Sequence, residues 1–264
     1  MKKIEYNLKS YSRALGGGSN AFIDVSDTCR ITGDKSTSAC DFTVCSLPLG
    51  VLKSSIDENS KLGKVKFSPA LPDTKVDSIE HVGFGILNKV YIQFPYSFWR
   101  KRGKKEELNG SVYLSDSEFN FGNASQINPQ HYMFFDLGFD PQKDDSSDPH
   151  ILHTLISGID AVRGENLSNE SIVREVMFTL RHLFQGIDVP NYVAFKVSRW
   201  GGDTFSQGAY SFLPPGTSEQ DYLSLQSSVC ADGDFYTVGD SKTMRLFFAG
   251  EHTSAHYPSL AHGE

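Results

Sequence analysis

The amino-acid sequence predicts a mixed α/β (α+β) fold with more strand than helix. Short apolar segments of strand length recur along the chain, and one clear amphipathic helix pattern follows Ser168. No internal repeat of solenoid or propeller type is present. With 264 residues, of which 39% are hydrophobic and 22% charged, the chain is long enough to bury a core of normal size.

The expected strands are bounded by turn-forming residues. The glycines at 16–18 are followed by no helix pattern and are interpreted as part of a hairpin rather than a phosphate loop. The dinucleotide fingerprint G-x-G-x-x-G is absent from the entire chain. Strands are expected at residues 21–25, 42–45, 89–94, 132–135, 151–156, 192–197 and 246–249.

The helix is expected from Asn169 to Gln185. Ser168 can cap its N-terminus, its apolar residues fall mostly on one face, and Gly186 can end it. The acidic, turn-rich segment 140–149 is expected to form a surface loop.

Composition and charge exclude several classes of protein. No segment approaches the roughly 18 consecutive apolar residues of a membrane span, and residues 1–10 lack the apolar run of a secretory signal. The 25 basic and 32 acidic residues give a net charge of −7, which disfavours a chain-wide nucleic-acid surface. The four cysteines show no C-x-x-C spacing, so we expect reduced thiols in an intracellular protein.

Two local clusters offer weak functional signals. His252, His256 and His262 could share a zinc ion, but Pro258 interrupts any helix there, and we expect no metal site. The basic run 100–105 (RKRGKK) suits a solvated loop, with a nuclear-import signal as the alternative. Neither cluster assigns a reaction.

Lys89 is the strongest single candidate for a functional side chain. It precedes the apolar segment VYIQF, and strand alternation is expected to point it towards the interior or a cleft. A buried lysine is costly unless it is paired, which favours a function. The alternative, equally compatible with the pattern, is a strand-end lysine that reaches water.

Four segments together carry a resemblance to a known family. They read CDFTVCSLPLGVLK (40–53), GFGILNKVYIQFPYSFW (83–99), VSRWGGDTFSQGAY (197–210) and RLFFAGEHTSAHYPSLAHG (245–263). In this order and spacing they resemble the C-terminal half of the flavin-dependent amine oxidases. The GFGxLNKV and SRW elements are most similar to the lysine-specific histone demethylase branch.

The resemblance implies part of a two-domain fold, in which an FAD-binding domain is entwined with a substrate-binding domain. Residues 1–85 and 219–264 would belong to the FAD-binding domain, and residues 86–218 to the substrate-binding domain. The N-terminal βαβ unit that holds the dinucleotide would be missing from this chain.

The same resemblance assigns the cofactor contacts. Gly50 would lie in a turn, and Gly250 would allow close backbone approach to the flavin. Glu251 would accept hydrogen bonds from ribityl hydroxyls, or alternatively satisfy backbone amides. For Trp200 and Phe205, core packing is the alternative to packing on the flavin. The implied cofactor contacts are Ser46, Leu47, Pro48, Trp200, Phe205, Ala209, Gly250, Glu251, Thr253, Leu260 and Ala261.

FAD would be held non-covalently, because Ala209 stands where monoamine oxidases carry a cysteine that bonds to FAD. The implied catalytic residues are Lys89, which would reach flavin N5 through a water, and Tyr210, which would form a wall beside the substrate amine. Substrate contacts are implied for Leu87, Asn88, Tyr210 and Leu260, and Leu260 would narrow the entrance for a peptide lysine.

The implied reaction is the removal of hydride from the carbon next to an amine nitrogen, followed by reoxidation of the flavin by oxygen. The leading substrate is a methylated lysine side chain. The alternatives are a polyamine oxidase-like enzyme and a truncated, non-catalytic copy that acts as a binding module. Chromatin-complex partners and a nuclear location are implied by the branch and by the basic run.

Overall fold

The computed structural model describes residues 21–24, 29–32, 37–60, 64–102, 111–113, 133–138, 149–230 and 244–260. The chain divides into two compact units, one of residues 1–85 with 202–264 and one of residues 86–201. The expected hairpin at 16–18, most of the expected loop at 140–149, and His262 lie outside the described residues. The assignment of cofactor and substrate domains stays a prediction.

In the described residues of the first unit, the strands form three small sheets. Their strand orders are β3-β2-β1-β5, β13-β14-β4 and β12-β6. The strands are β1 (Ala21–Asp24), β2 (Cys29–Thr32), β3 (Thr37–Cys40), β4 (Thr43–Cys45), β5 (Val65–Ser68), β6 (Gly83–Gly85), β12 (Tyr210–Phe212), β13 (Val229–Cys230) and β14 (Met244–Phe248). The helices are α2 (Leu49–Ile56), α3 (Asp73–His81), α6 (Glu219–Gln226) and the short 3₁₀ helix η6 (Glu251–Thr253).

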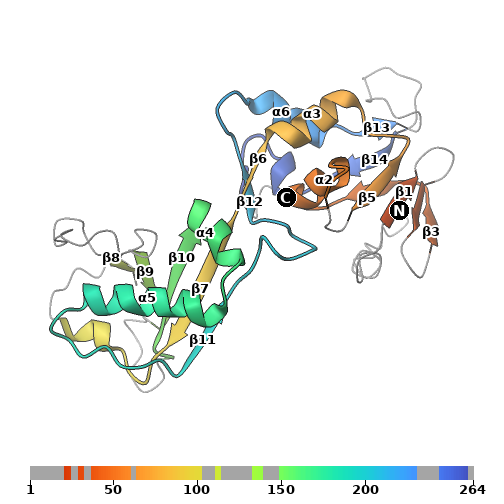
Figure 1. The fold of residues 1–264 in the computed structure, drawn as a ribbon. Helices are drawn as coiled ribbons and strands as arrows, with labels where there is room; N and C mark the ends of the chain where they lie inside the picture. The colour runs from red at the N-terminus through yellow and green to blue at the C-terminus, as the bar shows by residue number, and fades with distance from the viewer. Residues whose placement is uncertain are drawn as a thin grey trace, which may run out of the picture. The chain divides into compact units, whose positions relative to one another are not determined.

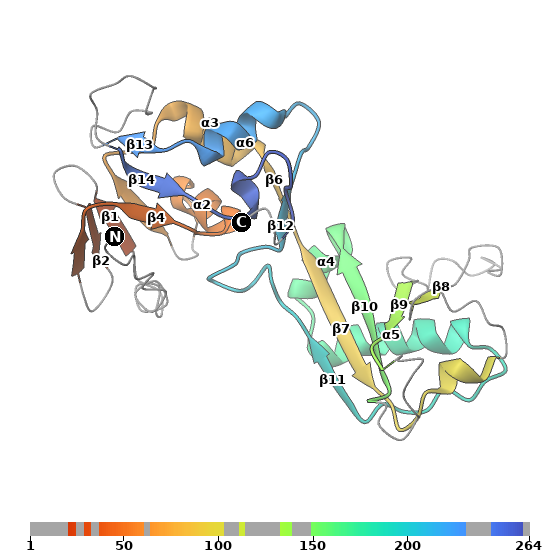
Figure 2. The ribbon, with the colours of Figure 1, turned by 180° about the vertical axis from the view of Figure 1, so that it is seen from behind.

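Two lysines tie the helices of this unit together. Helices α3 and α6 lie side by side in both views of the ribbon (Figures 1 and 2). The Nζ of Lys53 on α2 donates to the Ile79 and Glu80 carbonyls at the end of α3, at 2.6 and 2.8 Å. The Nζ of Lys75 on α3 donates to the Ser224 and Leu225 carbonyls near the end of α6, at 2.7 and 2.9 Å. Each lysine thereby donates to carbonyls in the last turn of a neighbouring helix, where the helix itself leaves acceptor capacity free.

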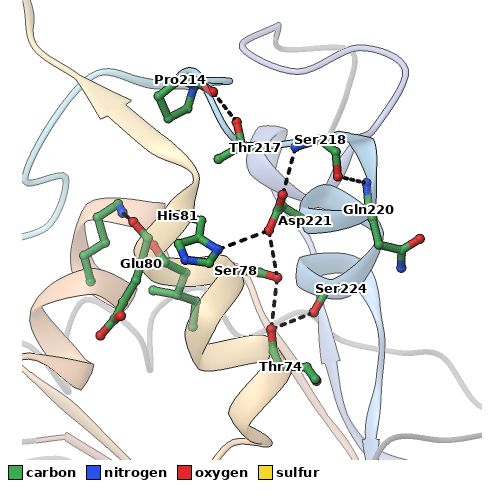
Figure 3. Close-up of polar contacts among 12 residues, drawn as sticks. Thr74, Ser78, Glu80, His81, Pro214, Thr217, Ser218, Gln220, Asp221 and Ser224 are labelled. Carbon is green, nitrogen blue, oxygen red and sulfur yellow. Dashed lines mark hydrogen bonds and ion pairs between the residues drawn. The ribbon is translucent and has the colours of Figure 1, made fainter.

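The N-terminus of α6 is fixed to α3 by polar side chains (Figure 3). The Ser218 hydroxyl accepts from the Gln220 amide, and Asp221 accepts from the Ser218 amide, which together form a capping box. Asp221 also lies 3.5 Å from the Ser78 hydroxyl and 3.7 Å from Nδ1 of His81. The two helices are therefore held at both ends of their contact.

The second unit is a five-stranded antiparallel sheet with helices on one face. Its strand order is β11-β7-β10-β9-β8. Figure 1 shows α5 lying across this sheet, and α4 and α5 bury their apolar residues in one core cluster with the strands. The elements are β7 (Leu87–Gln93), η1 (Phe98–Arg102), β8 (Ser111–Tyr113), β9 (Met133–Asp136), β10 (Ile151–Ser157), α4 (Gly158–Glu165), α5 (Asn169–Leu183) and β11 (Ala194–Val197).

The helix prediction is confirmed. Helix α5 begins at Asn169 as expected and ends at Leu183, slightly before the expected Gln185. The Ser168 hydroxyl accepts from the Ser171 amide at 3.1 Å, so the expected N-cap is present. Each expected strand also has a counterpart, although the ends differ.

Candidate functional site

Two turns of the first unit leave the sheet side by side. Strands β4 and β14 are parallel, with Phe248 opposite Cys45, and the Ala249 amide donates to the Cys45 carbonyl at 3.0 Å. The residues that follow, Ser46 and Gly250, therefore leave the sheet at the same carboxyl edge. Ligands of open α/β sheets bind at that edge.

The first turn leads directly into α2. Ser46 is exposed, Leu47 is buried, and Pro48 is the N-cap of α2. The expectation that Gly50 occupies a turn is wrong, because Gly50 lies in the first turn of α2. A Cβ at Gly50 would lie 2.5 Å from the Gln207 carbonyl oxygen, so the glycine allows the 206–207 backbone to cross the helix.

The second turn has a backbone conformation that favours glycine. Gly250 has φ +133°, and a Cβ there would lie 2.8 Å from Cε1 of His252. The amide and the hydroxyl of Thr253 both donate to the Gly250 carbonyl, at 2.9 and 2.8 Å. The turn is therefore tightly closed by its own residues.

The Glu251 carboxylate joins this turn to strand β12. The Ser211 amide donates to Oε1 at 3.1 Å, and the Ser211 hydroxyl donates to Oε2 at 2.7 Å. The Ser259 amide donates to Oε2 at 2.8 Å. The alternative function of Glu251, satisfying backbone amides, is thus present, and one acceptor position of Oε1 remains for a further donor. Contact with ribityl hydroxyls stays a prediction.

The predicted flavin-packing aromatic residue of this unit, Phe205, and the predicted substrate wall, Tyr210, are both exposed, and Tyr210 directly precedes Ser211. Tyr210, directly opposite Gly85 in β6, is 36% exposed, and Phe205 is 40% exposed. The Ala209 amide donates to the Gly85 carbonyl at 2.8 Å, so residues 209–212 follow β6 closely. Leu260 is also exposed, and Ala261 lies outside the described residues.

Beneath these turns lies a buried group of titratable side chains. Burial lowers the pKa of Lys75 to about 7 and the pKa of His252 to about 4. Burial raises the pKa of the Cys45 thiol to about 11. The Lys75 ammonium lies 4.0 Å from the centre of the Phe248 ring on β14. We therefore expect His252 to be neutral at physiological pH.

Lys89 belongs to the second unit and does not point into its core. Its neighbours Asn88 and Val90 are buried, whereas Leu87 and Lys89 are half-buried on the other face of β7. Within the described residues, no hydrogen bond or ion pair engages Lys89 Nζ. Burial, and secondarily the charge of Lys89, lowers the pKa of His153 on β10.

An aromatic stack lies on the same face of the sheet. The His153 ring is stacked between Tyr91 of β7 and Phe135 of β9, with ring centres 5.4 and 4.7 Å apart. The Nδ1 atom of His153 is buried without a hydrogen-bond partner among the described residues. The face that carries Lys89 is therefore apolar and aromatic rather than acidic.

Asn88 lies on the core side of β7 and contacts the segment that carries Trp200. Its Oδ1 accepts from the Trp200 amide at 3.0 Å and from the Ser198 hydroxyl at 3.3 Å. Its Nδ2 donates to Oε1 of Glu165 at 2.6 Å. The Trp200 side chain is 44% exposed.

The structure thus brings some predicted residues together within each unit. Ser46 lies beside Gly250, Tyr210 is joined to Glu251 through Ser211, and Asn88 is joined to Trp200. The sequence analysis missed several side chains in these regions. Ser211 could have been found, because it directly follows the predicted residue Tyr210. The missed residues are Ser198, Ser211 and Ser259, with Glu165 and His153 of the second unit.

Among the residues that the structure describes, no group of three or more histidine, cysteine, aspartate or glutamate side chains gathers to hold a metal ion. No helix in the described ranges has the length and apolar character needed to cross a membrane.

Comparison with known proteins identifies the class. Residues 23–263 match the family model of flavin containing amine oxidoreductases. The chain is 35% identical over 239 residues to lysine-specific histone demethylase 1 homolog 1 of Oryza sativa subsp. japonica, covering 90% of this chain and 24% of that protein. It is 29% identical over 232 residues to polyamine oxidase 1 of Zea mays, covering 88% of this chain and 38% of that protein.

A solved structure shows the same fold. Wild-type putrescine oxidase bound to putrescine superimposes with a TM-score of 0.62 at 17% identity, covering 93% of this chain and 44% of that chain. The chain therefore spans about a quarter of the length of the demethylase relative and less than half of the solved oxidase.

The chain belongs to the flavin-containing amine oxidoreductase family. Its relatives include histone demethylases and a polyamine oxidase, and the family implies a flavin cofactor and oxidation of amines. The residues present fit a flavin, because the turns after β4 and β14 leave parallel strands at the same carboxyl edge, Gly250 lies in the second of these turns, and Phe205 and Tyr210 of the same unit are exposed.

Proposed function

We propose that the protein containing this chain is an FAD-dependent amine oxidase that demethylates methylated lysine side chains. The similarity to the rice demethylase homologue over 90% of the chain supports this substrate over polyamines, which the more distant maize enzyme represents. We also propose a nuclear location and chromatin partners, which the resemblance to the demethylase branch and the basic run 100–105 imply.

The observation that carries the proposal is the environment of Lys89. This lysine extends from an ordered strand on an aromatic face, and its ammonium meets no carboxylate among the described residues. The Nζ atoms of Lys53 and Lys75, by contrast, both donate hydrogen bonds to helix carbonyls. Because the Lys89 ammonium is not paired with a carboxylate among the described residues, it is suited to provide a positive charge and a proton near a reacting centre.

The bound flavin would supply the redox chemistry by accepting hydride from the substrate carbon and passing electrons to oxygen. The chain's own residues would bind and orient the substrate and would exclude water from the site. Tyr210 would offer a ring face to the substrate amine. Lys89 would act as a proton source through a water molecule. The apolar surroundings would favour the uncharged amine, the form that can release hydride.

We propose that Ser46, Leu47, Pro48, Gly250, Glu251 and Thr253 contact FAD from the first unit, together with Phe205, Ala209, Leu260 and Ala261, and Trp200 from the second. Leu87, Tyr210 and Leu260 stay the proposed substrate contacts, whereas Asn88 is buried on the core side of β7 with its amide bonded to Glu165 and to the segment of Trp200. The link to FAD is non-covalent, because Ala209 provides no sulfur. Acid precipitation of the flavin-loaded protein should therefore release all of the yellow colour into the supernatant, and colour in the pellet would contradict this.

The central test substitutes Lys89→Met in the flavin-loaded protein that combines this chain with the rest of the family fold. Stopped-flow absorbance should show a larger slowing of flavin reoxidation by oxygen than of flavin reduction by a methyl-lysine peptide. The matched control is Lys196→Met, an exposed lysine of β11 in the register position opposite Tyr91. If the flavin of Lys89→Met is reoxidised at the wild-type rate, the proposed role of Lys89 in reoxidation is wrong and the residue is only structural.

The same preparation separates the substrates. A methyl-lysine peptide should reduce the flavin faster than spermine or spermidine at equal concentration. Faster reduction by the polyamines would replace the demethylase proposal with the polyamine oxidase alternative.

A further inference from the structure

We propose that Asn88 and Glu165 form a latch that positions the segment 198–201, and with it the indole of Trp200. The cofactor role of Trp200 rests on the proposed function, whereas the latch itself lies entirely within the unit of residues 86–201. Both latch residues act through Trp200 and are positioning residues.

The latch begins with a buried carboxamide. Asn88 is only 4% exposed, and both acceptor positions of its Oδ1 are occupied, by the Trp200 amide and the Ser198 hydroxyl. Its Nδ2 donates to Glu165 at 2.6 Å, a short distance typical of a charge-assisted hydrogen bond. The side chain therefore joins three separate parts of the unit: strand β7, the end of α4 and the segment after β11.

Glu165 provides the second half of the latch. It is the last residue of α4, and its Oε1 also accepts from the Gly201 amide at 3.3 Å. A Cβ at Gly201 would lie 3.2 Å from Oε1 of Glu165 and 2.9 Å from Cδ1 of Ile86. A larger residue at position 201 would therefore have to displace the ends of the Glu165 and Ile86 side chains, so glycine favours this close approach to the carboxylate.

The same segment is fixed to the backbone of Lys89. The Lys89 amide donates to the Ser198 hydroxyl at 2.7 Å, and the Ser198 amide donates to the Lys89 carbonyl at 2.9 Å. Because Ser198 also donates to Asn88, one hydroxyl connects the lysine strand and the tryptophan segment. The latch thereby sets the positions of Lys89 and Trp200 relative to one another.

Arg199 adds further bonds between the segment and the rest of the unit. Its guanidinium donates to the carbonyls of Gly164 and Leu167 and to the side chain of Asn169. With Ser198, Trp200 and Gly201 held by the latch, every residue of the segment is bonded to the unit, yet the Trp200 indole itself stays exposed. An exposed ring on a fixed backbone is the arrangement expected of a surface that receives a planar ligand.

The chain carries its own reporters, because it contains only two tryptophans. Trp99 is 5% exposed, and its Nε1 donates to Asp136, so it reports the core of the same unit. The 264-residue chain labelled with 5-fluorotryptophan should give two ¹⁹F resonances, which Trp200→Phe assigns.

Asn88→Asp should shift or broaden the Trp200 resonance and leave the Trp99 resonance in place, since a carboxylate cannot donate to Glu165 and would repel it. Glu165→Ala should do the same, whereas Glu165→Gln, which keeps the acceptor oxygen, should restore most of the wild-type signal. Glu175→Ala, the loss of a carboxylate on α5 that pairs with Arg163, is the matched control and should change neither resonance.

An unchanged Trp200 resonance in Glu165→Ala would overturn the latch, and so would a Glu165→Gln variant indistinguishable from Glu165→Ala. If Asn88→Asp unfolds the unit, the Trp99 resonance moves as well, and the Glu165 pair then decides. In the flavin-loaded protein, Glu165→Ala should also alter the visible spectrum of the flavin. A moved Trp200 resonance with an unaltered flavin spectrum would overturn only the cofactor role of Trp200.

Discussion

At the scale of single residues, Glu251 shows how one carboxylate serves several backbone groups. It accepts from the amide and hydroxyl of Ser211 and from the amide of Ser259, so the turn after β14, strand β12 and the chain near residue 259 meet at one side chain. The Ser211 hydroxyl also lies 3.0 Å from the Tyr222 hydroxyl on α6. Because Ser211 follows Tyr210, Glu251 fixes the strand that presents the proposed substrate wall.

Glu251→Gln should lower the free energy of unfolding by about 1–3 kcal/mol, because an amide NH₂ must then face a donor that the carboxylate accepted. Urea unfolding followed by circular dichroism measures this change. Glu58→Gln replaces an exposed glutamate of the same unit and should change stability by less than about 0.5 kcal/mol. Equal midpoints for the two variants would contradict the role of Glu251.

Lys75 makes the stability of the chain depend on pH. Burial lowers its pKa in the folded state to about 7, while the unfolded state keeps the ordinary value near 10.4. Between these values the unfolded state binds more protons, so stability should rise with pH from about 7 to about 9. Above about 9 the raised pKa of Cys45 acts in the opposite direction.

Urea midpoints measured at pH 6.5, 7.5 and 8.5 check this expectation. The wild-type midpoint should increase with pH, and Lys75→Met should show a flatter profile, whatever its overall stability. A variant with the wild-type slope would place the titrating group elsewhere.

Residues that lie in a recognisable sequence segment can be predicted, whereas contacts between residues far apart in the sequence cannot. Lys89 and Tyr210 were singled out because each lies in a segment with a readable pattern or resemblance. Asn88, by contrast, was expected to contact substrate, and the structure shows its amide bonded to Glu165, Ser198 and Trp200. Those partners are 77 to 112 positions away in the sequence, and no local pattern encodes such pairings.

At the scale of elements, the predictable features are those with local causes. Helix α5 combines a serine cap with apolar residues at helical spacing, and all of its expected core-facing residues up to Leu183 are buried. The short helices α2 and α6 were not predicted, since their eight residues provide little periodicity. Pro48 instead marks the start of α2, while the capping box of Ser218 and the distant Lys75 fix the two ends of α6.

The cap of α5 is directly testable. Ser168→Ala should lower the free energy of unfolding by about 1 kcal/mol, because the Ser171 amide loses its acceptor. Ser168→Asp should have nearly wild-type stability, since aspartate also accepts at this position and favours the positive end of the helix dipole. Thermal or urea unfolding distinguishes the two variants, and an equally large loss in both would show that the hydroxyl is not acting as a cap.

At the scale of the whole molecule, the chain carries one part of a family architecture. It spans 24% of the demethylase relative and 44% of putrescine oxidase, while 93% of its own length superimposes on the latter. The proposed cofactor contacts at the carboxyl edge of β4 and β14 would approach the dinucleotide from one side. No G-x-G-x-x-G sequence occurs in the 264 residues, although a glycine-rich turn and a helix N-terminus hold the pyrophosphate in this type of fold.

We therefore expect the 264-residue chain by itself to bind FAD weakly and to produce no hydrogen peroxide from amines. The purified chain, incubated with excess FAD and desalted, should retain far less than one flavin per chain by absorbance near 450 nm. Adding the remaining part of the family fold, fused or as a separate chain, should restore flavin binding, and Trp200→Ala should weaken the restored binding. A chain that alone retains stoichiometric FAD and oxidises a methyl-lysine peptide would show that the contacts described in its two units suffice.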